Sequence, residues 1–267
     1  MREFRNIEEK DCLELVKLNA SAFQDDHMEK ENCLNHIKED NLIGLFINNK
    51  LVGYLLMRIM GDYGHLAHIA VSAKHQRKGY GTELMKYSIE FFKKHNVKKM
   101  GLYVETKNVV AINMYKKCGY KVSNESWHYW IEKEQLEEIE TRHLSNTSGH
   151  IIEVKEEDYD RIVRSFPDIN KEELMYHLKS KKYMTLGYKI KGEIKVYARF
   201  NVNFSGCRPF LYINETRYVD EFIVKMKKYR KKEYFRLTFD NYKELSEEFE
   251  RRGYKLWHHL FNMEKNL

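Results

Sequence analysis

A short turn with two glycines carries the clearest chemical signal in this sequence. The segment Gln76-Arg77-Lys78-Gly79-Tyr80-Gly81-Thr82 follows an apolar run at 66–71 and precedes a helix-like run at 82–95. Two glycines one residue apart let the backbone direct several successive N–H groups into one cavity at a helix N-terminus. Such a cavity suits a phosphate or pyrophosphate. We therefore predict an anion site at residues 77–82, to which Arg77 or Lys78 could add charge unless solvent surrounds them.

A second pattern follows the apolar run 100–104. Asn108, Ala111 and Tyr115 are three, four and seven residues apart, which places them along one face of a helix. The small Ala111 lies between two polar residues and leaves room for a narrow ligand. Gly119 suits the left-handed residue that ends a helix. This spacing predicts a helix whose polar face borders the ligand.

Together the two patterns resemble the acyl-CoA core of the GNAT superfamily of N-acetyltransferases. The resemblance rests on a strand, the Q-x-x-G-x-G turn with its helix, a second strand, and N-x-x-A-x-x-x-Y-x-x-x-G-Y. It is close over residues 65–123 and extends in outline over residues 1–132. Dinucleotide and mononucleotide motifs fit less well, because the turn lacks G-x-G-x-x-G and the chain lacks G-x-x-x-x-G-K-[ST]. A structural turn with coincidental spacing is the other alternative.

The resemblance implies a fold and an activity. The fold is α/β (α+β), with a mixed, mostly antiparallel twisted sheet flanked by helices. The activity is transfer of an acetyl group from acetyl-CoA to a primary amine of a small molecule, by direct attack in a ternary complex. Two alternatives stay open: a protein or peptide amine as the acceptor, or a non-catalytic acyl-CoA-binding sensor or interaction module.

The resemblance also implies how the chain would hold acetyl-CoA. In the family, the strand before the turn splays from its neighbour and its backbone pairs with the pantetheine arm. By register, the Ile69 N–H becomes a donor to the thioester carbonyl. Asn108 would bond the arm from the opposite side, although a helix N-cap is its alternative role. The expected cofactor-binding residues are Ile69, Ala70, Val71, Gln76, Arg77, Lys78, Gly79, Tyr80, Gly81, Thr82, Asn108, Ala111 and Tyr115.

The expected catalytic residues are an acid and a base. Tyr115 is the candidate acid toward the departing thiolate, because a phenol with a reference pKa of about 10 is protonated at neutral pH. Its alternative role is packing under the sheet. His65 matches the register of the base in related acetyltransferases, Glu105 is the reserve, and a structural role for His65 stays open. We expect His68 on the other side of a regular strand.

The chain is long enough for two domains, and its second half faintly repeats the first. Residues 152–158 echo the opening seven residues, and 234–255 echo 100–121. Aligning Gly253 with Gly119 puts Phe249 where Tyr115 stands and Tyr242 where Asn108 stands. Residues 212–220, where the phosphate turn should fall, contain no glycine. We therefore predict a GNAT-like catalytic domain at 1–140, a linker within 133–149, and a degenerate GNAT-like domain at 150–267.

Composition limits the partners. The net charge is +7, and residues after 149 hold 25 Lys and Arg against 19 Asp and Glu. Dispersed lysines on solvated faces are the commoner cause of such an excess, so we do not expect a nucleic acid partner. The acidic stretch 21–40 could attract an amine cation, but an exposed helix face is the simpler interpretation.

Compartment and metal content follow from the same composition. Four separated cysteines suit a reducing compartment, and no run of eighteen apolar residues occurs. We expect a cytoplasmic protein without membrane contact or metal. The acceptor, the acyl-chain preference and a homodimer stay open.

Overall fold

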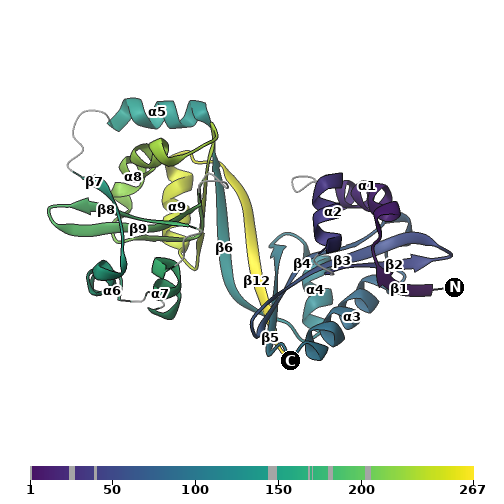
Figure 1. The fold of residues 1–267 in the computed structure, drawn as a ribbon. Helices are drawn as coiled ribbons and strands as arrows, with labels where there is room; N and C mark the ends of the chain where they lie inside the picture. The colour runs from purple at the N-terminus through teal and green to yellow at the C-terminus, as the bar shows by residue number, and fades with distance from the viewer. Residues whose placement is uncertain are drawn as a thin grey trace. The chain divides into compact units, whose positions relative to one another are not determined.

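The chain forms two compact units in the computed structural model (Figure 1). The structure describes residues 2–23, 28–38, 41–143, 149–167, 169, 171–179, 183–201 and 206–267. Unit 1 comprises Met1–Asn124 and Phe261–Leu267, and unit 2 comprises Glu125–Leu260. The chain therefore leaves unit 1 once and returns to it at its end.

A mixed sheet forms the centre of unit 1. Strands β1 to β4 pair as antiparallel neighbours in chain order, whereas β4 and β5 are parallel. The end of β12 lies next to β5, and the start of β6 lies next to β12. These strands are β1 (Arg2–Asn6), β2 (Leu42–Ile47), β3 (Lys50–Met60), β4 (Tyr63–Val71), β5 (Lys99–Glu105), β6 (Lys121–Ile131) and β12 (Leu256–Asn266).

Helices cover both faces of this sheet (Figure 1). On one face lie α1 (Cys12–Ala22) and α2 (Lys30–Lys38), preceded by the 3-10 turn η1 (Glu9–Asp11). On the other lie α3 (Tyr80–Lys94) and α4 (Val109–Lys117), and η2 (Ala73–His75) precedes α3. Apolar side chains of α3 pack into the core: Met85 and Phe92 are fully buried, and Ile89 is partly buried. Each face of the sheet therefore has its own apolar core.

Unit 2 repeats the order and the strand directions of unit 1. Strands β7 to β10 are antiparallel neighbours, and β10 and β11 are parallel. Most of β6 pairs antiparallel with β11. The elements are α5 (Lys133–His143), β7 (His150–Glu153), η3 (Glu156–Asp158), α6 (Tyr159–Ser165), α7 (Lys171–Lys179), β8 (Met184–Ile190), β9 (Glu193–Asn201), β10 (Gly206–Ile213), η4 (Thr216–Tyr218), α8 (Val219–Met226), η5 (Lys227–Tyr229), β11 (Phe235–Asp240) and α9 (Lys243–Arg251).

The ends of α4 and α9 match in detail. The Tyr120 N–H donates to the Tyr115 carbonyl, as the Tyr254 N–H does to the Phe249 carbonyl. The glycines that follow the two helices, residues 119 and 253, have φ of 88° and 79°. Such angles favour glycine, because a Cβ atom would be strained there.

The unit boundary differs from the expected 1–140 and 150–267. Residues 133–143 of the expected linker form α5, and residues 144–148 lie outside the described residues. Residues 121–131 form a single strand, β6, and the boundary between the units falls within it. Composition indicated a linker because α5 is charged, but Leu136 and Ile139 of this helix are buried in the core of unit 2.

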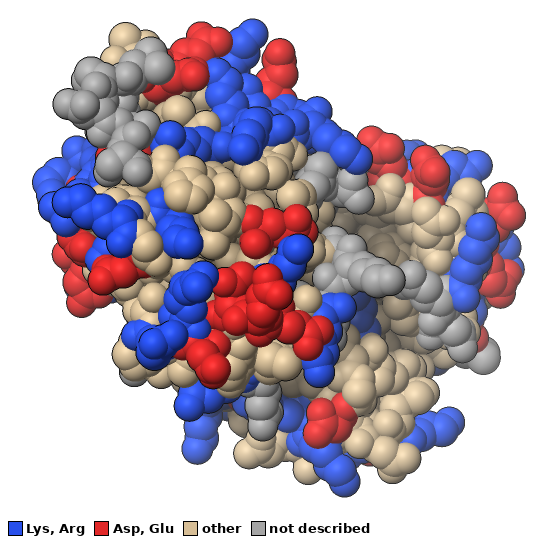
Figure 2. Space-filling view, turned by 60° about the vertical axis from the view of Figure 1, so that its left-hand side comes forward, with Lys and Arg blue, Asp and Glu red and all other residues tan. Residues whose placement is uncertain are grey.

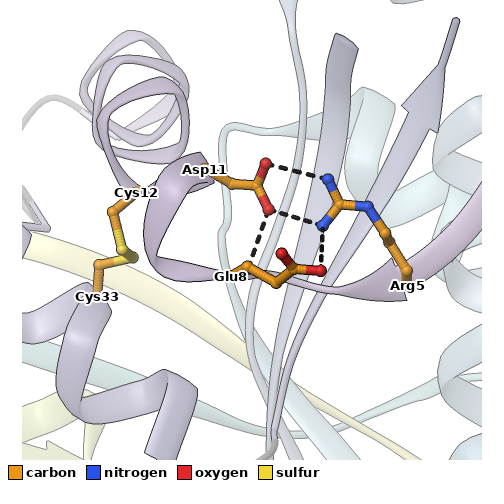
Figure 3. Close-up of a disulfide and its surroundings, with 5 residues drawn as sticks. All are labelled: Arg5, Glu8, Asp11, Cys12 and Cys33. Carbon is orange, nitrogen blue, oxygen red and sulfur yellow. Dashed lines mark hydrogen bonds and ion pairs between the residues drawn. A yellow bond between two sulfur atoms is a disulfide. The ribbon is translucent and has the colours of Figure 1, made fainter. Parts of the chain in front are cut away.

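The turn before α1 is held by an ion pair rather than by a side-chain cap. The Asp11 side chain makes no N-cap bond to α1. Instead, its two oxygens accept from the Arg5 guanidinium at 2.7 and 3.0 Å, and one also accepts from the Glu8 N–H at 3.0 Å (Figure 3). The next residue, Cys12, forms a disulfide with Cys33 of α2. The expectation of four reduced cysteines is therefore wrong for this pair, whereas Cys118 and Cys207 are free thiols.

Candidate active site

Strand β4 leaves its parallel neighbour β5 just before the glycine turn. Their register ends at His65 opposite Gly101, although β4 continues to Val71 and β5 to Glu105. The splay expected from the resemblance is therefore present in this chain. The divergence exposes one edge of β4 to the space between the two strands.

The other edge of β4 decides which backbone groups face this opening. The Ser72 N–H donates to the Val52 carbonyl of β3, in the register that pairs Ala70 with Tyr54. Because antiparallel pairs alternate, Ala70 also directs its N–H and C=O to β3, whereas Ile69 and Val71 direct theirs to the side of the opening. Of the three residues expected to hold the pantetheine arm, Ile69 and Val71 therefore have backbone groups that face the opening, where they could bond it. The backbone groups of Ala70 are used in pairing with β3.

The turn brings the N-terminus of α3 to the end of this opening. Gly79 caps the helix with φ 85°, and a Cβ atom there would meet nothing within 4 Å. The first intrahelical bond is Glu83 N–H to the Gly79 carbonyl, and no side chain caps this end. The N–H groups of residues 79–82 therefore lack helical acceptors. These unpaired donors fit a pyrophosphate group, and the helix dipole favours its negative charge.

Other residues of the turn have structural roles. The Gln76 side-chain amide donates to the Val71 carbonyl at 3.1 Å, which ties the turn back to the end of β4. A Cβ atom on Gly81 would lie 2.9 Å from the sulfur of Met114, so this glycine allows α3 and α4 to pack closely. Arg77 adopts φ 63° and is exposed, as is Lys78. Solvent exposure was the alternative foreseen for both cations.

Asn108 is the N-cap of α4. Its side-chain oxygen accepts from the Ala111 N–H at 3.1 Å. The alternative interpretation of Asn108 is therefore correct for its oxygen atom. The side-chain NH2 group is not used in this cap and is the part that could donate to a ligand. Ala111 lies on α4 and packs against the core.

Tyr115 lies in the core on the α3–α4 face. Its cluster includes Ile69 of β4 and Val104 of β5, and its ring lies 6.1 Å from that of Tyr120. Burial raises the pKa of Tyr115 well above its usual value, and Cys118 adds to this shift. The phenol is therefore protonated throughout the neutral range, as a general acid must be before it donates.

The two histidines of β4 share one face, contrary to the expectation. His65 pairs with Arg58 and His68 pairs with Leu56, and these partners are two residues apart on β3. Leu66 pairs with Met57, so Ala67 is an extra residue that forms a β-bulge. A bulge shifts the alternation of side chains by one, and therefore two residues three apart point to the same side.

This common face is the one covered by α1 and α2. Leu56 and Ala70 belong to its core, and the His68 ring lies 4.9 Å from that of Phe23. The His65 ring lies 6.1 Å from the ring of Tyr103 on β5. Glu105 alternates with Tyr103 and so shares this face. The candidate bases thus lie on one face of the sheet, and the candidate acid Tyr115 lies on the other.

A buried hydrogen-bond chain beside His68 had no signal in the sequence. The Asn19 oxygen accepts from the Met28 N–H at 2.7 Å, so its NH2 group donates to the Tyr54 hydroxyl at 2.8 Å. The Tyr54 hydroxyl in turn contacts the His68 Nδ1 atom at 3.1 Å. Asn19 and Tyr54 are fully buried and lie 35 positions apart, which is why no local pattern indicates the contact.

Other candidate features lie elsewhere. The acidic stretch is exposed at Glu29 and Glu31, whereas 25, 26, 39 and 40 lie outside the described residues. A hollow of about 500 Å³ in unit 1 contains none of the expected site residues; it is lined by His36, Asn41, Met57, Arg58, Ile59, Met60, Phe91 and His95. Over the part of the chain that the structure describes, there is no metal-binding group of three ligands and no helix long and apolar enough to cross a membrane.

Comparison with known proteins identifies the family that unit 1 resembles. Residues 3–120 match the model of the acetyltransferase (GNAT) family. The chain carries a GNAT acetyltransferase domain. It is an acetyl-CoA-dependent N-acetyltransferase.

The GNAT domain has relatives with different acceptors. It is 28% identical over 145 residues to an N-alpha-acetyltransferase of Sulfurisphaera tokodaii, which covers 49% of this chain and 86% of that protein. It is 26% identical over 114 residues to a spermidine N(1)-acetyltransferase of Thermoplasma acidophilum, which covers 40% of this chain and 71% of that protein.

Some solved structures resemble the whole chain, and one of them serves as an example. A GCN5-related N-acetyltransferase from Sphaerobacter thermophilus has a TM-score of 0.66 and covers 99% of this chain and 95% of that one. The two sequences are 12% identical, so this likeness shows the fold alone.

Proposed function

We propose that unit 1 transfers the acetyl group of acetyl-CoA to a primary amine of a small molecule, by direct attack in a ternary complex. One observation carries this proposal: β4 leaves β5 beside the unpaired N–H groups of α3, with Tyr115 on one face and His65 and Glu105 on the other. This arrangement offers a place for the thioester between an acid and a base.

Each step then has a residue in unit 1. Residues 79–82 hold the pyrophosphate, and the Ile69 N–H donates to the thioester oxygen, where negative charge develops. The amine nitrogen bonds to the carbonyl carbon as the C–S bond breaks. His65, or Glu105 in its place, receives the amine proton directly or through water, and Tyr115 gives its proton to the sulfur.

Two relatives support different acceptors. The spermidine acetyltransferase supports a small polyamine, and the N-alpha-acetyltransferase supports a protein or peptide amine as the second candidate. A panel that contains spermidine, other small amines and short peptides with free N-termini separates the two. Faster turnover of the peptides would replace our proposal with the second candidate. Binding of acetyl-CoA without turnover of any amine would favour a sensor.

We further propose that unit 2 is a degenerate GNAT-like copy without catalytic function. The repeated order of elements supports a common origin. Phe249 stands where Tyr115 does in unit 1 and has no hydroxyl to donate. The N-cap of α8, the helix after β10, is Tyr218 with φ −87°, whereas the N-cap of α3 in unit 1 is Gly79 with φ 85°. Because unit 2 has no glycine at this position, its backbone is less able to approach a pyrophosphate group closely.

Calorimetric titration with acetyl-CoA, followed by kinetics, tests both proposals. We expect one equivalent per chain. Tyr115→Phe should lower kcat by about 10²-fold or more with nearly unchanged acetyl-CoA affinity, because the phenyl ring keeps its packing and loses only the hydroxyl group that donates the proton. Phe249→Tyr is the matched control and should leave kcat unaltered. Two equivalents would overturn the proposal for unit 2, and unchanged turnover in Tyr115→Phe would overturn the assignment of the acid.

We also propose the cytoplasm as the location. The structure forms a disulfide between Cys12 and Cys33. Thiols are kept reduced in the cytoplasm, so this location requires that the pair be reduced in the cell, in contrast to the structure. Thiol labelling of the denatured protein after rapid acid quenching of cells measures this directly. Retention of the disulfide in quenched cells would contradict the cytoplasmic location.

A further inference from the structure

The positive charge of unit 2 is concentrated in one segment. Residues 225–236, which we call the basic segment, contain Glu233 and seven cations: Lys225, Lys227, Lys228, Arg230, Lys231, Lys232 and Arg236. Seven cations and one acid give +6, compared with +7 for the whole chain. The expectation that dispersed lysines cause the excess is therefore wrong.

The fold turns these cations outward. The basic segment runs from the end of α8 through η5 to the start of β11. Its apolar side chains Met226 and Phe235 are fully buried, and the Tyr229 ring packs 6.4 Å from that of Phe200. Lys228, Lys231 and Lys232 are exposed. Figure 2 shows Lys and Arg side chains gathered in a band on one face of the molecule.

Few acidic groups neutralise this charge. Lys227 pairs with Glu140 at 2.6 Å, and Glu233 pairs with Lys133 of α5 at 3.7 Å. Among the residues that the structure describes, no carboxylate lies within 4 Å of the ammonium groups of Lys225, Lys228, Lys231 or Lys232. Four cations of one segment are therefore available to an external anion.

Aromatic rings hold several of these cations in place. The Lys228 ammonium lies 4.9 Å from the centre of the Tyr229 ring, and the Lys232 ammonium lies 5.4 Å from that of Tyr234. Burial would raise the pKa of Tyr234, but a hydrogen bond with Lys232 and the charges of Arg236 and Lys232 lower it below its usual value. A phenol whose pKa falls despite burial indicates a positive local potential.

A concave surface adjoins the basic segment. A hollow of about 470 Å³ is lined by Glu140, His150, Ile151, Val224, Lys225, Lys227 and Lys228. The Glu140 carboxylate in this lining is already paired with Lys227. The hollow therefore presents two further lysines and a histidine to a ligand, and a phosphate group could be held between them.

We propose that the basic segment and this hollow bind the phosphate backbone of a nucleic acid. Closely spaced cations interleaved with tyrosines are typical of surfaces that follow such a backbone. A membrane is less favoured, because the apolar side chains that would anchor the segment in a bilayer are buried in unit 2. An acidic protein would lack the regular spacing of phosphates.

The test is a salt series with the full chain and a fluorescent single-stranded RNA of about 20 nucleotides, longer than the site of one binding domain. The variant combines Lys228→Gln, Lys231→Gln and Lys232→Gln. The matched control combines Lys93→Gln, Lys94→Gln and Lys98→Gln, which are exposed lysines at the corresponding end of α3 in unit 1. All six positions are exposed, so thermal melting should be unchanged and serves as the folding control.

We expect measurable RNA binding at low salt. The logarithm of the association constant should fall linearly with the logarithm of the salt concentration between about 50 and 200 mM. In the variant, the loss of three phosphate contacts should reduce the magnitude of the slope of log K against log salt concentration by about 2. The control should keep the slope of the wild type. Three results would each overturn the proposal: no RNA binding at the lowest salt, equal slopes for the two variants, or tighter binding of polyglutamate or of phosphatidylserine vesicles than of RNA.

Discussion

Tyr115 and the histidines of β4 are the residues on which the chemistry depends. Tyr115 lies among the apolar side chains of α3, α4, β4 and β5, where burial keeps its hydroxyl protonated. His65 and His68 lie on the opposite face of the sheet, because Ala67 bulges out of the strand register. A single extra residue in β4 thus decides how many imidazoles share the face of the proposed acceptor site.

The two histidines should respond differently to substitution. His65→Gln should lower kcat/KM by about 10²-fold at neutral pH if His65 is the base. His68→Gln should mainly lower thermal stability, because the Tyr54 hydroxyl loses its contact with the His68 Nδ1 atom. Tyr54→Phe is the control for this second effect and should reproduce it. Equal activity losses in the two histidine variants would mean that they serve one function together.

Element α1 depends on an ion pair that precedes it. The Asp11 carboxylate accepts two bonds from Arg5 and one from the Glu8 N–H. Burial raises the pKa of Asp11, but these bonds outweigh it and lower the pKa below its usual value. The carboxylate therefore stabilises the fold only while it is ionised.

Asp11→Asn should destabilise the protein by about 1–3 kcal/mol at pH 7, as expected for hydrogen bonds to a charged group. A lowered pKa in the folded state means that the stabilisation is present above about pH 4, the unfolded value, and is lost as pH falls through the folded value. The difference in Tm between wild type and variant should therefore shrink on acidification. Glu9→Gln, an exposed acid of the same turn, is the control; a pH-independent difference would contradict the assignment.

The last residues of the chain pack into unit 1. Met263 is fully buried in the core of unit 1, Glu264 pairs with Lys99 at 2.6 Å, and the Leu267 N–H donates to the Lys98 carbonyl. The proposed active site is therefore supported by residues 261–267, which lie more than 150 positions after β5 in the chain.

Deletion of residues 261–267 should abolish acetyl-CoA binding in calorimetry, although every proposed site residue is retained. The physical reason is that β5 loses its neighbour and the core of unit 1 opens to water. Removal of residues 266–267 alone is the milder control and should retain binding. Full affinity after the longer deletion would show that the site in unit 1 forms without the end of β12 and would overturn this prediction.

The sequence by itself determined the features that depend on neighbours in the chain. The strand, the Gly79 turn and the helix that ends at Gly119 follow from local conformational preferences. The repeat was visible because the same local signals recur at Gly253. These features include most of the proposed acetyl-CoA residues.

Only the tertiary structure decided what depends on distant partners. The Ala67 bulge is defined by pairing with β3, the Asn19–Tyr54–His68 chain joins three elements, and Cys33 reaches Cys12 because α1 and α2 pack together. The end of β12 likewise joins unit 1 through contacts with residues far away in the sequence, such as the ion pair between Glu264 and Lys99. Contacts between residues far apart in sequence leave no local pattern, since either partner alone is compatible with many neighbours.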